Sequence, residues 1–396
     1  MSLAEAGLSS VPTMASGRTR PAVRVATTRD LRLDFYRGLA MFIIFVAHVP
    51  FNPWALWIPA RFGFSDATEI FVFCSGMASA FAFGRTFGAR GWPVGAARTL
   101  YRAWQIYWVH IGLFVALAGI LVLIDGATAV EDGHVAGLEL QPFFADPAAG
   151  LAGLVTLRYV PKHFDILPMY FGILLLLPLV MAARSLGRWA PAFLVGGLWF
   201  VAQLGWLGLP AEPWSDRVWF FNPFGWQLVF FTGFAFASGW IGAPPVSPRL
   251  VALAAAVLLV SVPFVHFAAL DASPFLAAAA DRLAPLASKT ELGLLRYLHF
   301  LTLAYLAYVV SGPGGERLRA SGATGVVASA IHKVGQQALA TFVMGMICAR
   351  LAPVLLDALG GSALAVAATN LAGFAVLIAT AYVAGWFRTE RTAPRA

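Results

Sequence analysis

The chain has 396 residues, of which 60% are hydrophobic and 12% are charged, and its mean hydropathy is +0.77. This composition excludes a soluble globular domain and is typical of a polytopic membrane protein. The formal net charge is +8, but the positions of the basic residues attribute it to membrane topology, so no nucleic-acid partner is expected.

Hydrophobic stretches long enough to cross a bilayer as a helix follow one another along almost the whole chain. There are ten of them: 33–50, 67–84, 99–124, 166–184, 190–207, 223–242, 249–267, 294–312, 334–353 and 363–386. We therefore predict an all-α polytopic membrane protein with about ten transmembrane helices. Residues 29–388 are expected to form a single integral-membrane domain, between a flexible tail at 1–28 and a short tail at 389–396.

Basic residues set the orientation, because segments rich in Lys and Arg stay in the cytoplasm. With the amino terminus inside, the segments on the cytoplasmic side hold 19 Lys/Arg and 5 Asp/Glu, and those on the outer side hold 8 and 14. The resulting charges of +14 and −6 add up to the total of +8. Both termini are therefore predicted to be cytoplasmic.

The first hydrophobic stretch, RLDFYRGLAMFIIFVAH, carries ionisable residues at both ends. Arg37 and His48 are eleven residues apart, so they share one helical face and lie about 16 Å apart along the axis. Asp34 joins that face and can pair with Arg37. Ionisable groups in a span are costly unless they face the bundle interior or a wet cavity, which makes these residues functional candidates. The alternative is a snorkelling arginine and a hydrogen-bonded core histidine.

Two arginines follow at the start of the third stretch, where Arg98 and Arg102 lie one helical turn apart at the inner surface. Two guanidinium groups in this arrangement suit phosphate groups. Basic residues here are also what the topology predicts. His110, two turns further in, is either a buried polar contact or part of a hydrophilic pathway.

Three further stretches bring ionisable residues to the outer ends of spans: Glu69 at the start of the second, Lys162, His163 and Asp165 before the fourth, and Arg296 and His299 in the eighth. A carboxylate that is hydrogen-bonded to an imidazole fixes its tautomer and stabilises its protonated form. Asp165 or Glu69 could serve His48 in this way. The alternative for each of these residues is a helix cap or a surface charge.

The other patterns give weaker signals. The aromatic residues of loop 208–222, Trp214 and Trp219 among them, fit either an interfacial aromatic belt or stacking on sugar rings. Ser75 has no nucleophile elbow around it and is read as a packing residue. No two histidines have a metal-ligand spacing on one helix, so no metal is expected.

Taken together, these stretches resemble a known family. An arginine followed eleven positions later by a histidine in the first span is similar to the opening motif of the integral-membrane acyltransferase-three superfamily. Within it the chain resembles the OpgC branch, whose members succinylate osmoregulated periplasmic glucans. The stretches that carry the resemblance are LDFYRGLAMFIIFVAHVP, SDATEIFVFCSGM, LPMYFGILLLLPLV, LRYLHFLTLAYLAY and VGQQALATFVMG.

The resemblance implies a membrane-bound O-acyltransferase of the bacterial inner membrane, with a cytoplasmic acyl-CoA, succinyl-CoA, as donor and a periplasmic glucan as acceptor. It matches His48 to the superfamily's proposed catalytic base, Arg37 to its partner in the motif, and Arg98 and Arg102 to the basic pair that holds the donor's phosphates. We expect Asp165 and Glu69 in the catalytic site as well. The candidates for binding substrate are Asp34, His163, Arg296 and His299.

Selection of succinyl over acetyl requires a cation near the distal carboxylate of the acyl group. The candidates in the outer half of the bundle are Lys162, Arg296 and Arg350.

Three other functions also fit parts of the sequence. A secondary transporter would have a similar number of spans and buried charges, which His110 favours and the lack of two-half symmetry opposes. A scaffold subunit of a glucan-export complex would not depend on His48. An acyltransferase acting on lipopolysaccharide, peptidoglycan or an exopolysaccharide would keep the chemistry and change the acceptor.

Overall fold

The computed structural model describes residues 30–127, 133–319 and 321–390. Within these ranges every regular element is a helix, and extended backbone pairs only in an isolated bridge between Pro210 and Val218. The predicted tail at 1–28 and almost all of the predicted tail at 389–396 lie outside the described residues. The principal helices are α1 (Leu31–His48), α2 (Ala67–Ser79), α4 (Trp92–Ala127), α8 (Ile166–Leu186), α9 (Ala190–Gln203), α10 (Pro223–Ala237), α11 (Pro248–Ser261), α14 (Leu294–Ser311), α16 (Ala338–Ala358) and α17 (Ala363–Glu390).

Six helices in the described residues are long and apolar enough to cross a membrane: Ala67–Arg90, Trp92–Ala127, Ile166–Leu186, Leu294–Ser311, Ala338–Ala358 and Ala363–Arg388. The first of them runs from α2 through the π-helical turn η3 (Ala80–Gly84) into α3 (Arg85–Arg90). Three shorter apolar helices are Ala190–Gln203, Pro223–Ala237 and Pro248–Phe264. The protein is therefore an all-α, multi-pass membrane protein.

Residues 313–333, between the eighth and ninth predicted spans, contain a helix that is not predicted from the sequence. After η6 (Pro313–Leu318), α15 (Gly322–Gln336) packs against α1 and α17. Its contact with α1 depends on two glycines: a Cβ on Gly38 would lie 2.0 Å from the Ile331 carbonyl oxygen, and one on Gly335 would lie 1.9 Å from the Asp34 carbonyl oxygen. The hydropathy pattern does not indicate α15, because polar residues are interspersed with apolar ones along this helix.

The crossing of α2 and α10 also depends on two glycines, one on each helix. A Cβ on Gly76 of α2 would lie 1.9 Å from the Phe230 carbonyl oxygen, and one on Gly233 of α10 would lie 2.2 Å from the Phe73 carbonyl oxygen. Small residues at these positions let the two backbones touch, which is how membrane helices gain close packing. This crossing fixes where α2 lies relative to the rest of the bundle.

The segments expected outside the membrane contain short helices. Within 125–165 the chain forms α5 (His134–Gly137), α6 (Gln141–Ala145) and α7 (Pro147–Val155), and within 268–293 it forms most of α12 (Phe267–Ala272) and α13 (Pro274–Leu283). In loop 208–222, Trp219 is buried, and its indole Nε1 donates to the carbonyl oxygens of Leu157 and Pro210. Trp219 therefore anchors two outer segments to each other.

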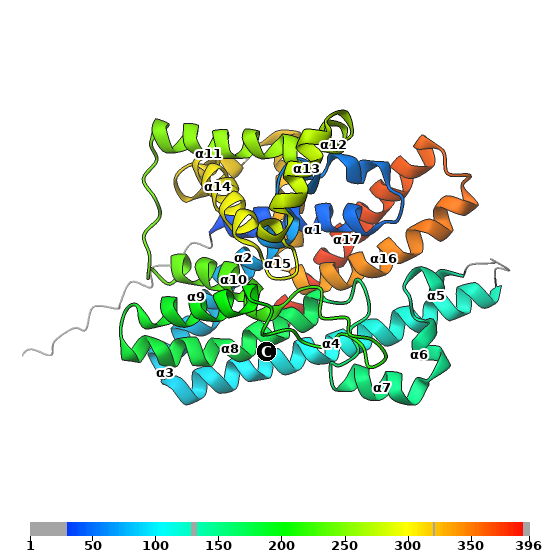
Figure 1. Cartoon of the computed structure of the whole chain (residues 1–396), viewed down its shortest axis with the longest axis horizontal. Coiled ribbons are helices and arrows are strands. Elements are labelled where there is room, and N and C mark those ends of the chain that lie inside the picture. The colour runs from blue at the N-terminus through cyan, green and yellow to red at the C-terminus, as the bar shows by residue number, and fades with distance from the viewer. Residues whose placement is uncertain (1–29, 128–132, 320, 391–396) are drawn as a thin grey trace, which may run out of the picture.

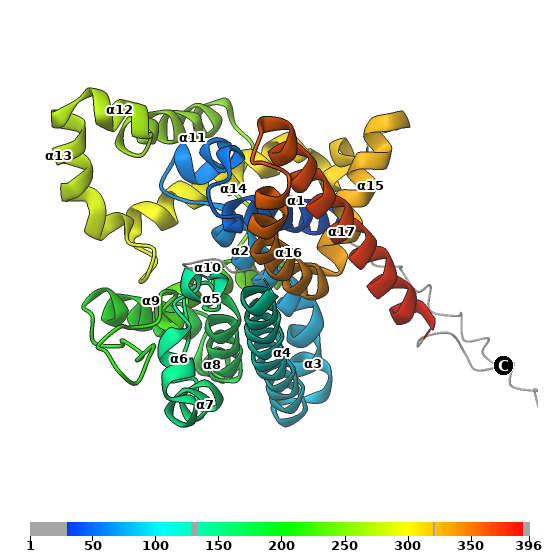
Figure 2. The same ribbon diagram turned by 90° about the vertical axis from the view of Figure 1, so that its right-hand side faces the viewer.

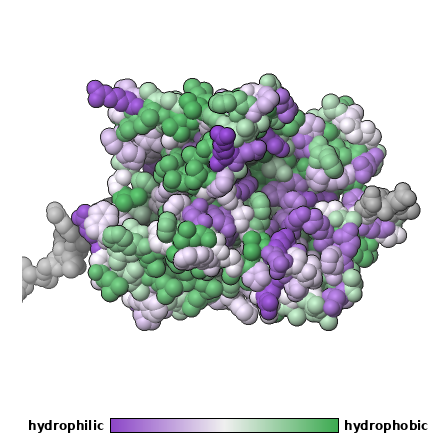
Figure 3. All heavy atoms as spheres, viewed as in Figure 1, coloured by the Kyte–Doolittle hydropathy of each residue, from purple (hydrophilic) through white to green (hydrophobic). Residues whose placement is uncertain are grey.

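Helix α1 lies at the centre of the bundle (Figures 1 and 2). It packs against α2, α15, α16 and α17, while α4 and α8 pack against each other in the lower part of both views. Figure 3 shows hydrophobic side chains over much of the lower left of the molecule, whereas hydrophilic ones gather right of centre, between α16 and the elements α4 to α7. The polar side chains thus concentrate toward the ends of the helices from which the candidate site is built.

Candidate active site

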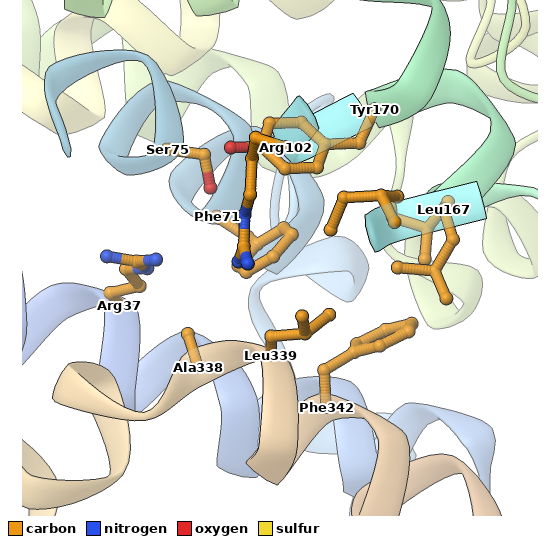
Figure 4. Close-up of a pocket in the computed structure, with 11 residues that line it drawn as sticks. Arg37, Phe71, Ser75, Arg102, Leu167, Tyr170, Ala338, Leu339 and Phe342 are labelled. Carbon is orange, nitrogen blue, oxygen red and sulfur yellow. The ribbon is translucent and has the colours of Figure 1, made fainter. Parts of the chain in front are cut away.

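A narrow cavity of about 30 Å³ lies between α1, α2, α4, α8 and α16. Arg37 of α1 and Arg102 of α4 line it together with Ser75 and Tyr170. Figure 4 shows both arginine side chains reaching the cavity from different helices, with Leu167 and Phe342 on the side away from Arg37. Two guanidinium groups that face one cavity suit an anionic group, and apolar side chains line the side away from Arg37.

The two arginines that line the cavity are not the pair Arg98 and Arg102 that the sequence suggested. Arg98 is exposed and donates from Nη1 to Thr86 Oγ1 at 2.8 Å. Arg102 is half-buried and donates from Nη1 to Gln105 Oε1 at 3.0 Å. The cavity therefore brings Arg102 together with Arg37, and Arg98 lies outside its lining.

His48 is the last residue of α1, about 16 Å along the axis from Arg37. Its Nδ1 lies 2.7 Å from the Ile44 carbonyl oxygen. A carbonyl oxygen can only accept, so Nδ1 carries the proton and the neutral ring keeps a free lone pair on Nε2. An imidazole held in this tautomer is suited to accept a proton from a hydroxyl group.

Two further side chains gather around His48. The His163 ring lies edge to face with the His48 ring at a centroid distance of 5.8 Å, and the charge of Arg350 on α16 reaches both imidazoles. The backbone of His163 has φ = 72°, in the left-handed region that non-glycine residues seldom adopt. Burial, and then the charge of Arg350, lower the pKa of His163 to about 3, so this ring is neutral at physiological pH.

A network of four ionisable residues lies at the amino-terminal end of α2. Asp66 caps α2 and forms a reciprocal capping box with Glu69. Lys289 donates to Asp66, and Arg296 Nη1 donates to Glu69 Oε1 at 2.9 Å. Burial opposes the ionisation of Asp66, but the charges of Lys289 and Arg296 outweigh it and hold its pKa well below the usual value. The network is therefore a set of mutually compensating buried charges.

His299 lies beside this network. Its Nδ1 is 2.7 Å from Ser65 Oγ and also accepts from the Ser65 backbone N–H at 3.3 Å. Because Nδ1 accepts, the proton of the neutral ring is on Nε2, which is buried and faces Gly63, where a Cβ would lie 2.1 Å away. His299 thus holds the loop that precedes Asp66.

Comparison with known protein families matches residues 29–389 of the chain to the OpgC protein family. The chain belongs to the OpgC family. Membership implies acyltransferase activity in general terms, and the matched residues include the whole helical bundle that the structure describes, up to the last residue of α17. No curated protein and no solved structure gives a significant match.

The two carboxylates expected beside His48 make other contacts in this OpgC protein. Glu69 pairs with Arg296, and Asp165 Oδ1 accepts from the Phe220 backbone N–H at 3.2 Å. Burial raises the pKa of Asp165 to about 6. Among the described residues, the Ile44 carbonyl is the hydrogen-bond partner of the His48 ring. Roles for Glu69 and Asp165 in catalysis stay predictions.

The remaining candidates are dispersed. Asp34 is buried on α1 near the crossing with α15, at the opposite end of the helix from His48. His110 is buried on α4, its ring lies against Phe164, and neither ring nitrogen has a hydrogen-bond partner in the described part of the chain. The described residues give no group of three or more potential metal ligands to examine, and the expectation of a metal-free protein stays a prediction.

Sequence reasoning missed Asp66 and Lys289. The signal for Asp66 was present, because an aspartate three residues before a glutamate at the start of an apolar run is the signature of a capping box. Lys289 had no local signal. It reaches Asp66 from a segment that is 223 residues away in the sequence.

Proposed function

We propose that this OpgC family protein transfers a succinyl group from succinyl-CoA in the cytoplasm to glucose hydroxyls of periplasmic glucans, and that it does so in the bacterial inner membrane. The observation that carries the proposal is the arrangement on α1. Arg37 lines a cavity with Arg102 near one end of the helix, and His48 presents a free Nε2 at the other end.

The proposal includes a topology of ten membrane-spanning helices. These are the six long apolar helices, the three shorter ones, and α1, which carries Arg32, Asp34 and Arg37 in its first two turns. With both termini in the cytoplasm, Arg37 and Arg102 lie toward the inner surface and His48 toward the outer one. The phosphates of the donor bind at the inner arginines, and the pantetheine arm carries the thioester toward His48.

The chemistry is one acyl transfer. The oxygen of a glucose hydroxyl attacks the carbonyl carbon of the thioester, and His48 Nε2 takes the hydroxyl proton. A carbon–oxygen bond forms, the carbon–sulfur bond breaks, and the proton passes from the imidazolium to the departing thiolate. The products are a succinyl ester and CoA, and His48 returns to its neutral form.

Charged neighbours act on this step without touching the ring. Asp66 lies within electrostatic range of His48 and favours the imidazolium, whereas the charges of Arg350 and Lys289 oppose it. Glu69 supports Asp66 through the capping box and binds Arg296. Lys289 is held by Asp66 and by the face of the Phe221 ring, with Nζ 5.6 Å from its centroid. A fixed network of this kind needs little reorganisation as charge develops.

Mass spectrometry of periplasmic glucans tests the proposal. Cells carry the intact gene, a deletion, His48→Ala, or the control His134→Ala, which removes an outer histidine bound to Asp125. Each variant is compared at equal abundance in the membrane. Succinylated glucans are expected only from the intact protein and from His134→Ala. Identical glucans from all strains would show that the acceptor is not a periplasmic glucan or that the protein is not a succinyltransferase. The other envelope polysaccharides of the deletion strain would then be searched for the loss of an acyl group.

A reaction with purified protein separates transferase from transporter. Full-length protein in lipid nanodiscs is mixed with succinyl-CoA labelled in the succinyl group and with isolated glucan. Transfer of label to the glucan, dependent on His48, supports an acyltransferase. Intact protein that transfers no acyl group to any acceptor would favour a transporter.

A further inference from the structure

Arg350 is a buried cation without a partner among the residues that the structure describes. Its side chain is 7% exposed. Within the described ranges it makes no hydrogen bond or ion pair, and its Nε is buried with no acceptor. A buried guanidinium is unfavourable unless an anion compensates its charge. The site therefore calls for an anionic ligand that the described residues do not supply.

The other two candidate cations, Lys162 and Arg296, and the neighbouring Lys289 are already paired. Lys162 donates to Glu139 at the exposed surface. Lys289 pairs with Asp66, and Arg296 pairs with Glu69. Even with both acids ionised, the cluster of Lys289, Arg296, Arg350, Asp66 and Glu69 keeps at least one positive charge, and Arg350 is the member that carries it.

Position along α16 places Arg350 at the level of His48. Ala338, Phe342, Met346 and Arg350 follow one another at four-residue spacing on the buried face of the helix, and the first two line the cavity. Arg350 is about 18 Å further along the axis than Ala338. The corresponding separation of Arg37 and His48 on α1, which packs against α16, is about 16 Å.

We propose that Arg350 binds the free carboxylate of the transferred acyl group and thereby selects a dicarboxylic acyl donor over a neutral one. The inference rests on the proposed function, because it places the thioester beside His48. In a succinyl group only two methylene carbons separate the thioester carbon from the free carboxylate, so the residue that recognises this carboxylate must lie close to the base. The donor's phosphates are held at Arg37 and Arg102, in a cavity whose lining does not include Arg350, so they do not compete for it.

Selectivity follows from the cost of leaving Arg350 unpaired. A succinyl group supplies a planar anion that a guanidinium binds through two parallel hydrogen bonds. An acetyl or butyryl group supplies none and leaves the buried charge uncompensated. A site built around a buried polar group discriminates strongly against analogues that lack its partner.

Donor competition tests the assignment. Purified full-length protein in nanodiscs acylates isolated glucan from succinyl-CoA or from butyryl-CoA, which has the same number of acyl carbons and no carboxylate. Arg350→Gln is expected to lower kcat/KM for succinyl-CoA by about 10- to 100-fold and to leave butyryl transfer within about threefold. Arg350→Lys keeps the charge but loses the two-pronged geometry, so it should retain part of the preference.

Arg158→Gln is the matched control, because Arg158 is an exposed outer arginine that lines a different cavity from Arg37 and Arg102, and its donor preference should equal that of the intact protein. An equal loss of kcat/KM with both donors would overturn the inference, because Arg350 would then stabilise the oxyanion or the fold and would not select the donor. An unchanged succinyl preference in Arg350→Gln would overturn it as well. Arg350→Gln could fail to reach the membrane, in which case Arg350→Lys provides the test. A preference of Arg350→Lys for succinyl-CoA over butyryl-CoA as strong as that of the intact protein would then overturn the inference. Intact protein that does not transfer succinyl at all marks failure of the proposed function itself.

Discussion

The rings of His48 and His163 lie edge to face, with centroids 5.8 Å apart and planes at 72°. His48 ends a central helix, whereas His163 belongs to the turn that precedes α8. The left-handed backbone of His163 directs its ring to this position. A neutral ring against the proposed base limits how the base can turn, because aromatic pairs have a preferred geometry. His163 thus acts as a positioning residue in the proposed site.

Replacement of His163 by Leu is expected to lower kcat by about 3- to 10-fold through loss of this ring contact. The pH dependence should not move, because the pKa of His163 is about 3 and the ring is uncharged throughout the range of activity. Rates of glucan acylation between roughly pH 5 and pH 9 check both points. A shifted midpoint would show that His163 carries charge in the active protein.

Arg102 and Arg98 should differ in their effect on the donor. Arg102→Gln removes a cavity-lining guanidinium and is expected to raise KM for acyl-CoA by about tenfold, with a smaller change in kcat. Arg98→Gln should have the smaller effect, because Arg98 is bound to Thr86 outside the cavity lining. Steady-state kinetics with purified protein decide the order, and a larger effect from Arg98 would place the phosphates outside the cavity lining instead.

Much of the bundle could be predicted from hydropathy, because lipid demands apolar helices of a certain length. The described helices begin within a few residues of most predicted spans, α4 being the main exception with its start at Trp92. The helix α15 could not be predicted in this way. It is held by close backbone contacts with α1 at Gly38 and Gly335. The mean hydropathy of a sequence window does not reveal contacts between two distant helices.

The candidate site was predictable where the signal is local. The spacing of Arg37 and His48 follows from one helix, and the hydrogen bond from His48 to Ile44 spans a single turn. The choice of Arg350 among the outer cations was not predictable. Arg296 finds Glu69 across 227 residues of sequence, so only the folded structure reveals which cation is left without an acid.

Asp66 allows a test of the charge network through stability. Its pKa in the folded protein lies below the unfolded value of about 3.9. The ion pair with Lys289 therefore stabilises the protein fully above that unfolded value, and this contribution is lost as the pH falls toward the folded one. Asp66→Asn keeps a helix cap but removes the charge, and it should lower the free energy of unfolding at pH 7 by about 3 kcal/mol.

Melting of the detergent-solubilised protein measures this effect. The difference in melting temperature between the intact protein and Asp66→Asn is expected to be largest near neutral pH and to shrink in acid, at about pH 3. Glu139→Gln breaks an exposed ion pair with Lys162 and serves as the control, with little change in melting temperature. A difference for Asp66→Asn that is the same in acid would contradict the ionised state assigned to Asp66.

The crossing of α2 and α10 predicts a sharp contrast between two glycines. At Gly76 a methyl group would lie 1.9 Å from the Phe230 carbonyl oxygen, and a backbone atom in a packed helix has little freedom to move away. Gly76→Ala is therefore expected to destabilise the protein by about 2 kcal/mol or more. The change also displaces Ser75, which lines the cavity, so acylation should fall together with the melting temperature.

Gly119→Ala is the matched control, because nothing lies within 4 Å of a Cβ placed on Gly119 in α4. Alanine favours the helix over glycine by about 1 kcal/mol, so this variant should melt at the same temperature or higher. Both substitutions add one methyl group to an apolar helix, and only the contact at the crossing distinguishes them. Equal melting temperatures would mean that α2 and α10 do not touch at Gly76, and the placement of Ser75 at the cavity would then lose its support.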